Sequence, residues 1–413
     1  MNEPKLRFKA DDGNAFPDWE EKKIGDVCDP LTYGMNAAAV KFDGKNKYIR
    51  ITDIDDKSHR YLADEFVSPG GELDDKYLVS ENDILLARTG ASVGKSYIYD
   101  KKDGKLYYAG FLIKAHVKSG IGKIIFYQTL TDRYNKWVKV MSVRSGQPGI
   151  NANEYSDFMV FVPSLPEQQK IADFLSTIDT VIEKQKATVE AWEERKKGVM
   201  QKLFSQEVRF KADDGSDFPE WEEKKLGDVA DFFNGDRSAR YPKETDFVKY
   251  GVAFLNTENL HNTIVDISEK CKYITYEKYC ELSGAKIQLL DIIYCLRGSV
   301  GLCSLNTILE EGTVASSLMV IRAVDGIIDP IYLYNSLNSD FVLGQLYQCL
   351  NGSCAGNLSA KDMAMFKIKC PCLAEQQKIA VCLSSLDEVI EKQKATLAAW
   401  EELKKGLLQQ MFV

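Results

Sequence analysis

The sequence predicts two mixed α/β (α+β) globular domains separated by two long antiparallel helices that form a coiled coil. Three observations predict this fold. A short segment occurs twice, a long helical pattern occurs twice, and the two blocks between them barely resemble each other. The repetition also predicts a circular, pseudo-two-fold arrangement of the parts. One frame that holds two different inserts is typical of a protein with two binding domains of different preference.

The short repeat is nearly identical in its two copies. Arg7–Val27 reads RFKADDGNAFPDWEEKKIGDV, and Arg209–Val229 reads RFKADDGSDFPEWEEKKLGDV, 202 residues later. The helical pattern Glu167–Phe204 recurs at Glu375–Phe412, 208 residues later. These repeats set the expected parts of the chain: a first domain at 1–165 with the repeated segment 5–27, a first helix at 166–205, a second domain at 206–373 with the repeated segment 207–229, and a second helix at 374–413.

Both long patterns are typical of coiled-coil helices. Their apolar residues alternate in steps of three and four, which is the heptad seam of a coiled coil. At 1.5 Å per residue each helix runs about 55 Å, a stripe too long for one small domain to cover. We therefore expect the helices to pack on each other through Ile171, Leu175, Ile178, Ile182, Gln185, Val189, Trp192, Ile379, Leu383, Leu386, Ile390, Gln393, Leu397 and Trp400.

Polar residues interrupt this seam at equivalent places. Gln185 and Gln393 would lie close together in an antiparallel pair, where a buried polar contact fixes register at some cost in stability. The alternative is that both glutamines point to solvent. An antiparallel pair would also bring Phe412 near Arg7 and close the circular arrangement.

Each insert contains a predicted strand that leads into a glycine turn. Asp83–Arg88 precedes Thr89–Lys95, and Asp291–Arg297 precedes Gly298–Gly301. Such a turn lets backbone N–H groups approach phosphate closely, and a flanking arginine can bind a phosphate or a guanine edge. The first turn resembles an ATP-binding loop, but three residues separate its glycines where that motif needs four, so no ATP site is expected.

A second polar turn ends each insert, at Arg144–Asn151 and Asn351–Ser359. Short amides and hydroxyls on a glycine turn suit hydrogen bonds to base edges. Asn151 and Ser359 fit the role of helix caps equally well. The resulting candidate DNA contacts are Arg88, Thr89, Lys95, Arg144, Gln147, Asn151, Asn234, Arg237, Arg240, Arg297, Ser299, Asn351 and Asn357.

The charge balance argues against a general nucleic-acid binder. The chain has a net charge of −8. Cys28–Leu165 has 19 Lys and Arg against 17 Asp and Glu, and Ala230–Leu373 has 13 against 16. A protein that gripped phosphate by itself would be more basic. Either DNA is not the partner, or a partner protein supplies much of the positive surface.

Composition excludes several other classes. With three histidines and no CxxC pair, a zinc site is not expected. The ten cysteines fit buried free thiols in a reducing cytoplasm. The start of the chain has no apolar stretch typical of a signal peptide, and no apolar run of about 18 residues could span a bilayer, so no membrane partner is expected.

The motifs together resemble those of a known family. They are Gly-Asp-Val after a Trp-Glu turn, Asp-Ile-Leu followed by Arg, Gly and Gly-Lys, and Glu-Gln-Gln-Lys-Ile-Ala after a proline at the start of a long helix. Over essentially its whole length the chain resembles the specificity (S) subunit of type I restriction-modification enzymes, which serve in host defence.

That resemblance implies a role without catalysis. Cys28–Leu165 and Ala230–Leu373 would be target-recognition domains, each reading one half of a bipartite, asymmetric site in double-stranded DNA. The helices would set the gap between the halves and dock two adenine-N6 methyltransferase (M) subunits, which motor/endonuclease (R) subunits join. It implies no cofactor and no metal in this chain, and a cytoplasmic protein.

Two other functions are open to test. A DNA methyltransferase in its own right would need an Asn/Asp-Pro-Pro-aromatic loop to hold the flipped adenine, and the sequence contains no Pro-Pro dipeptide. An assembly scaffold, whose inserts bind proteins, would show no sequence preference on DNA when combined with its methyltransferase partner.

Overall fold

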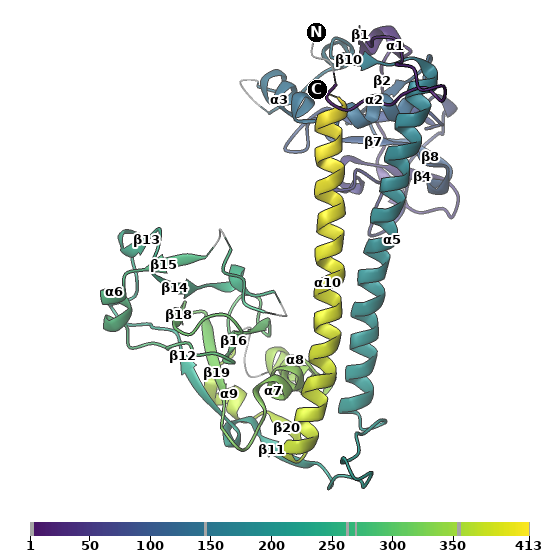
Figure 1. Cartoon of the computed structure of the whole chain (residues 1–413). Helices are drawn as coiled ribbons and strands as arrows, with labels where there is room; N and C mark the ends of the chain where they lie inside the picture. The colour runs from purple at the N-terminus through teal and green to yellow at the C-terminus, as the bar shows by residue number, and fades with distance from the viewer. Residues whose placement is uncertain (1–3, 144–146, 262–263, 269–270, 353–356, 413) are drawn as a thin grey trace. The chain divides into compact units, whose positions relative to one another are not determined.

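The structure, a computed structural model, describes residues 4–143, 147–261, 264–268, 271–352 and 357–412. The chain forms two compact units, each with its own core. Unit 1 comprises Met1–Lys186 and Ala395–Val413, and unit 2 comprises Ala187–Lys394. Each unit therefore contains one globular domain and a part of both long helices, which are α5 (Leu165–Phe204) and α10 (Leu373–Met411) (Figure 1).

Unit 1 is built on an antiparallel sheet with strand order β2-β9-β6-β7. A parallel pair, β4 with β8, and the antiparallel pairs β3–β5 and β1–β10 complete its strands. The elements are β1 (Glu20–Lys23), α1 (Ile24–Val27), β2 (Thr32–Tyr33), β3 (Ala39–Lys41), β4 (Lys47–Ile49), β5 (Val67–Pro69), β6 (Asp83–Ala87), β7 (Ser96–Ile98), β8 (Leu106–Tyr108), β9 (Leu112–His116), α2 (Gly122–Gln128), α3 (Asp132–Met141), α4 (Ala152–Ser156) and β10 (Met159–Val162).

Unit 2 repeats the strand order of the main sheet and joins the strands of the second layer into one sheet. Its main sheet has the antiparallel order β12-β19-β16-β17, a second sheet has the order β13-β15-β14-β18 with β14 and β18 parallel, and β11 pairs with β20. The elements are β11 (Glu222–Lys225), β12 (Ala230–Asn234), β13 (Phe247–Val248), β14 (Val252–Leu255), β15 (Lys272–Ile274), α6 (Tyr276–Glu281), β16 (Ile292–Cys295), β17 (Cys303–Leu305), β18 (Gly312–Val314), β19 (Leu318–Ala323), α7 (Pro330–Leu337), α8 (Asp340–Asn351), α9 (Ala360–Ala364) and β20 (Lys367–Cys370).

The central strand of each unit separates two cores. On β6, Ile84 and Leu86 belong to the core that the long helices cover, whereas Leu85 and Ala87 belong to a second core on the other face. Successive side chains of a strand point to opposite faces, so a strand buried on both sides is apolar throughout. This explains the continuous apolar runs in both inserts, and β16 divides two cores of unit 2 in the same way.

The predicted fold is confirmed at the level of elements. Both long helices form, and Pro166 lies in the first turn of α5, where a proline lacks no needed hydrogen bond. The predicted strands at 83–88 and 291–297 are β6 and β16. The main sheets of the two inserts have the same strand order despite their dissimilar sequences.

The cysteines depart from the expectation of buried free thiols at several positions. Of the described cysteines, Cys28, Cys271, Cys295, Cys303 and Cys370 are buried free thiols, Cys372 and Cys382 are half-buried, and Cys280 is exposed. Cys349 is disulfide-bonded, which corrects the prediction for that residue. Within the described ranges, no group of His, Cys, Asp and Glu side chains is placed to hold a metal ion. Within the same ranges, no helix is long and apolar enough to cross a membrane.

Candidate nucleic-acid interface

The repeated segment of unit 1 is attached to the start of α5 by a buried carboxylate. Glu167 is fully buried and accepts hydrogen bonds from Arg7 Nε (3.1 Å), Arg7 Nη2 (2.9 Å) and Trp19 Nε1 (2.9 Å). A buried carboxylate needs such charged and polar donors to offset its desolvation. The RFK…W segment and the Glu-Gln-Gln helix start are therefore two halves of one contact.

Unit 2 contains the same contact with nearly the same distances. Glu375 is fully buried and accepts from Arg209 Nε (3.2 Å), Arg209 Nη2 (2.9 Å) and Trp221 Nε1 (3.0 Å). The hydrogen bonds that Arg209 donates to Glu375 raise the pKa of Arg209, so the guanidinium stays charged. This contact explains why both segments recur together in the sequence.

The next residue of each helix start fixes a helix of the globular domain. Gln168 Oε1 accepts from Ile121 N (2.9 Å), at the start of α2. In unit 2, Gln376 Oε1 accepts from Asp329 N (2.8 Å), at the start of α7. Side-chain acceptors satisfy backbone N–H groups that a helix start leaves unpaired. The repeated motif thus joins each domain rigidly to its long helix.

The two long helices pack together within each unit. In unit 1, Leu175 on α5 shares a core with Met411 on α10, and in unit 2, Phe204 on α5 shares a core with Leu383 on α10. The start of each helix thus meets the end of the other, so the pair is antiparallel. The fourteen predicted interface residues are all buried or half-buried. Gln185 and Gln393 are half-buried, and their contact with each other remains a prediction.

Lysines in the seam are paired with aspartates of the partner helix. Lys404 Nζ lies 2.6 Å from Asp179 Oδ1, and Tyr127 Oη donates to the same carboxylate (2.8 Å). Burial, followed by the negative charge of Asp179, raises the pKa of Tyr127, so its hydroxyl stays protonated and remains a donor. In unit 2 the helices exchange roles, with Lys196 Nζ 2.6 Å from Asp387 Oδ1.

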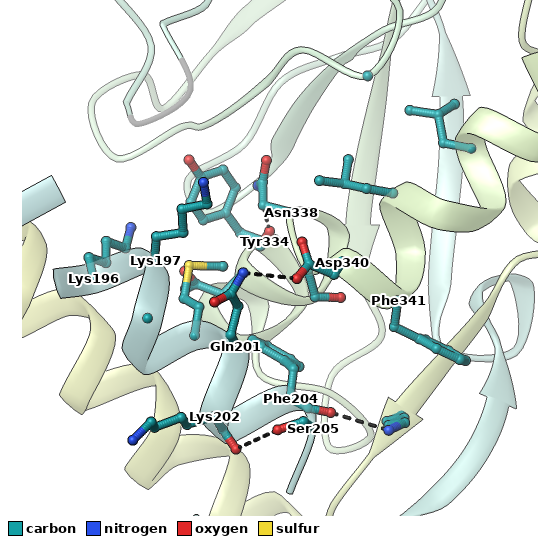
Figure 2. A pocket seen from close by; sticks show the side chains of 18 of the residues that line it. Lys196, Lys197, Gln201, Lys202, Phe204, Ser205, Tyr334, Asn338, Asp340 and Phe341 are labelled. Carbon is teal, nitrogen blue, oxygen red and sulfur yellow. Dashed lines mark hydrogen bonds between the residues drawn. The ribbon is translucent and has the colours of Figure 1, made fainter. Parts of the chain in front are cut away.

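A groove of about 1140 Å³ lies in unit 2, where the end of α5 faces α7 and α8 (Figure 2). Gln201 Nε2 donates to Asp340 Oδ2 (3.2 Å) across it. Lys369 Nζ donates to Phe204 O at the end of α5 (3.2 Å). Ser299, one of the predicted DNA contacts, lies on the wall of this groove.

The predicted polar turns of unit 1 lie side by side. Arg88 N donates to Phe111 O (3.1 Å), Ile150 N donates to Arg88 O (2.9 Å) and Gly34 N donates to Leu112 O (3.1 Å). We call these five residues the turn frame of unit 1. Three chain segments that are distant in sequence are thereby held at the end of the central strand β6.

Unit 2 has a turn frame with the same hydrogen bonds. Leu296 N donates to Ser317 O (2.9 Å), Leu358 N donates to Leu296 O (3.2 Å) and Gly235 N donates to Leu318 O (3.2 Å). Gly34 and Gly235 also make the same close approach, because a Cβ at either would meet a backbone oxygen at 2.2 Å. The backbone of the two frames is therefore equivalent position by position.

The side chains differ at three of the five equivalent frame positions, whereas Gly34 matches Gly235 and Leu112 matches Leu318. Arg88 corresponds to Leu296, and Arg297 corresponds to Thr89, so the two arginines of the predicted turns are not equivalent to each other. The position of Arg297 in its frame is one residue later than that of Arg88. Because successive side chains along a strand point to opposite faces, the two arginines do not occupy the same face. Other equivalent positions that carry different residues are Tyr33 with Asn234, Phe111 with Ser317, Ile150 with Leu358, Gly149 with Asn357, and Asn151 with Ser359.

Several predicted contacts are engaged within their own unit. Lys95 Nζ donates to Ile54 O (2.9 Å) and forms an ion pair with Asp56. Asn151 and Ser359 are N-caps, of α4 and α9 respectively, which was one of the two roles that the sequence left open. A cap side chain is already used as a hydrogen-bond acceptor, so its remaining capacity for a base is smaller.

The other predicted residues lie on the surface. Arg237 Nη2 donates to Ser316 O (3.3 Å) and Arg240 Nη1 donates to Glu281 O (3.2 Å), and both side chains are exposed. Arg144 lies outside the described residues. Arg88 and Thr89 are half-buried, whereas the following are exposed: Gln147, Asn234, Arg297, Ser299, Asn351 and Asn357.

Sequence reasoning missed two aromatic residues beside Arg88. The Arg88 guanidinium lies 4.7 Å from the centre of the Tyr33 ring, a cation–π contact. The Phe111 side chain is 63% exposed. Both residues belong to segments far from the predicted turns in sequence, and only the backbone hydrogen bonds of the frame reveal that they are neighbours.

Comparison with known proteins agrees with this geometry. The model of the type I restriction modification DNA specificity domain matches residues 17–191 and again 219–399. The type I restriction enzyme MjaVIII specificity subunit of Methanocaldococcus jannaschii is 26% identical, over 97% of this chain and 94% of its own. The putative MjaX specificity subunit of the same organism is 24% identical, with the same coverage of 97% and 94%.

Solved structures give the same fold. The S subunit of a type I restriction-modification system from M. genitalium matches with a TM-score of 0.58 at 16% identity, covering 100% of this chain and 99% of that chain. A chain from a structure of type I complex assembly and conformational transition matches with a TM-score of 0.52 at 15% identity, covering 95% and 97%. With the family model matched twice along its length, the chain belongs to the family of type I restriction-modification DNA specificity subunits.

Proposed function

We propose that each unit of this protein reads one half of a bipartite, asymmetric DNA site. The observation that carries the proposal is the pair of turn frames. Their backbone hydrogen bonds are equivalent, but their side chains differ at three of the five frame positions and at flanking pairs such as Tyr33 with Asn234. Sequence is read through side chains that reach base edges, whereas backbone geometry only positions them. Two equal frames with unequal side chains are suited to two different half-sites.

The long helices set the gap between the half-sites in this proposal. Each helix contributes residues to both units, so the proposal expects a change in helix length to change the gap. Seam contacts on both sides of the unit boundary support a stiff pair, since Lys404 meets Asp179 in unit 1 and Lys196 meets Asp387 in unit 2.

The chain itself has no catalytic part in this scheme. Two methyltransferase subunits dock on the helices and transfer methyl groups to adenine N6, and motor/endonuclease subunits join that core. The net charge of −8 supports a shared grip on DNA, in which the methyltransferase subunits supply much of the phosphate contact. Because the DNA in question is chromosomal or invading DNA, the complex would work in the cytoplasm.

Mapping of methylated adenines tests the proposal. The chain is combined with its methyltransferase subunits, and genomic DNA is mapped before and after residues 28–165 are exchanged for the matching insert of another specificity subunit. We expect a two-part motif in which one half changes and the other half and the gap persist. A change in both halves would refute independent reading. A complex without any sequence preference would favour a protein-binding scaffold instead.

A further inference from the structure

Phe111 is an exposed aromatic side chain on a rigid turn. Its turn, Ala109–Leu112, is closed by Leu112 N donating to Ala109 O (2.8 Å). Gly110 N donates to Met35 O (2.9 Å), and Phe111 O accepts from Arg88 N (3.1 Å). The backbone is thus fixed on three sides, while the side chain is 63% exposed and packs in no core of unit 1. Folding does not account for an aromatic residue at this position.

The neighbours of Phe111 form a surface of mixed chemistry. Tyr33 Oη accepts a hydrogen bond from Ala152 N (3.1 Å), which fixes the ring, and Arg88 stacks over that ring at 4.7 Å. The Tyr33 side chain is 42% exposed. An arginine that can bind a guanine edge therefore stands next to apolar groups. In the major groove, the apolar mark of a base pair is the C5-methyl group of thymine.

The equivalent place in unit 2 is polar. Ser317 stands where Phe111 stands in unit 1, and Asn234 stands where Tyr33 stands. Leu296, at the position of Arg88, is fully buried. An apolar contact with a base at this place is therefore available to unit 1 alone.

We propose that Phe111 is a specificity-determining residue that packs against the C5-methyl of one thymine in the half-site read by unit 1. Arg88 beside it supplies the polar part of the same contact. This inference rests on the proposed function, because it requires that unit 1 reads DNA. It adds the chemical identity of one base mark and the side chain that reads it.

Deoxyuridine substitution tests this contact. The full chain is assembled with its methyltransferase subunits and titrated with duplexes of the mapped site, in which each thymine of the unit 1 half is replaced singly by deoxyuridine. Removal of the methyl group at one position should weaken binding of the wild-type complex about tenfold, the lower range for one altered base pair. Phe111→Ala should weaken binding to the unmodified duplex by a similar factor and should lose no more on the deoxyuridine duplex.

Two variants serve as controls. Phe111→Leu keeps an apolar side chain and should retain part of the response to the methyl group. Phe66→Ala removes another exposed aromatic residue of unit 1, which packs against Phe42 and Tyr61. It should leave the deoxyuridine response as in the wild type.

The outcomes separate this inference from the proposed function. Three results would overturn the inference. The first is that Phe111→Ala and the deoxyuridine substitution weaken binding independently, so that their factors multiply. The others are a unit 1 half-site without thymine and unchanged binding of Phe111→Ala. 2-Aminopurine fluorescence detects base unstacking. Unstacking that does not depend on the thymine methyl group would overturn the inference and would mean that Phe111 inserts between bases. A complex that shows no sequence preference would overturn the proposed function itself. Because Phe111 is exposed, the Phe111→Ala variant should fold. If the variant complex keeps its sequence preference in the half-site read by unit 2, the protein is folded.

Discussion

Lys196 of α5 and Asp387 of α10 form an ion pair of 2.6 Å, and Lys404 of α10 and Asp179 of α5 form its counterpart with the helices exchanged. The lysine and aspartate side chains are 14% and 32% exposed in the first pair. A polar group in an apolar seam contributes more to register than to stability. The two pairs favour an antiparallel alignment in which each lysine meets its aspartate.

Loss of one partner should therefore destabilise unit 2. Asp387→Asn leaves Lys196 charged in a half-buried seam, and we expect a loss of about 1–3 kcal/mol in the free energy of unfolding, below the value for full burial. Urea denaturation measures it. Glu193→Gln, in the exposed pair with Lys394, should cost about 0–1 kcal/mol. Equal effects of the two variants would contradict the seam role.

The buried carboxylate of the helix start gives a comparable expected effect. Glu375→Gln removes the charge that faces Arg209 and places an amide against its guanidinium. We expect a loss of about 1–3 kcal/mol, below the value for full burial, because the Arg209 side chain that remains is 21% exposed. Glu190→Gln, at an exposed position of α5, is the control and should be near neutral. A near-neutral Glu375→Gln in chemical denaturation would argue against this anchor.

Cysteine reactivity should follow burial. Burial raises the pKa of Cys28 to about 12, and burial likewise raises the pKa of Cys303 to about 12. Since the thiolate is the reactive form, both remain thiols at pH 8 and should resist iodoacetamide in the folded protein. Cys280 is exposed and should be alkylated first. Mass spectrometry of digested protein measures the order, and labelling of Cys28 as fast as Cys280 would contradict it.

Arginine substitutions should distinguish sequence-specific contacts from a general effect of positive charge on DNA binding. Arg88→Ala removes a cation from the turn frame of unit 1 and should weaken binding of the mapped site by about 1–3 kcal/mol, with relaxed preference in that half alone. Arg195→Ala removes an exposed cation of α5 that stacks on Trp192, and binding should change little. Titration with both complexes compares them. An equal loss for both would mean that Arg88 contributes only general charge.

Helix length should set the gap between half-sites. One extra heptad after Lys186 and one after Lys394, at the boundary between the units, should lengthen the gap by about three base pairs. Seven residues added between Ser205 and Val208, in the link after α5, should leave the gap unchanged. Methylation mapping reads both variants, and an unaltered gap after the double insertion would mean that the helices are not the ruler.

Most elements were predictable because they depend on local patterns. The heptads of α5 and the apolar run of β6 lie within one stretch of sequence each. The contact of Glu167 with the repeated segment was not predicted, although both of the segments that form it recur in the sequence. Repetition of two segments does not indicate that they contact each other. The role of Phe111 escaped for the same reason, since its neighbour Arg88 is joined to it only by a backbone hydrogen bond.

The candidate site was predictable as a region and not as a set of contacts. Arg88 and Arg297 look equivalent in sequence, but the turn frames place them one residue apart. A shift of one residue in a strand reverses the direction of a side chain, and a sequence without an alignment does not fix that register. Lys95 was predicted to contact DNA because it is charged. Its ion-pair partner Asp56 lies in a loop that contains no recognisable motif.

The contribution of residues 395–413 to unit 1 has a consequence for biosynthesis. Leu408, Met411 and Phe412 belong to the core of unit 1, and Leu6 N donates to Gln410 O (3.1 Å). A nascent domain generally folds as soon as its residues have left the ribosome. Residues 1–186 of unit 1 are made first, yet their apolar surface stays open until residues 395–413 have been translated. A stop codon before Leu408 would therefore damage the unit whose larger part is translated first.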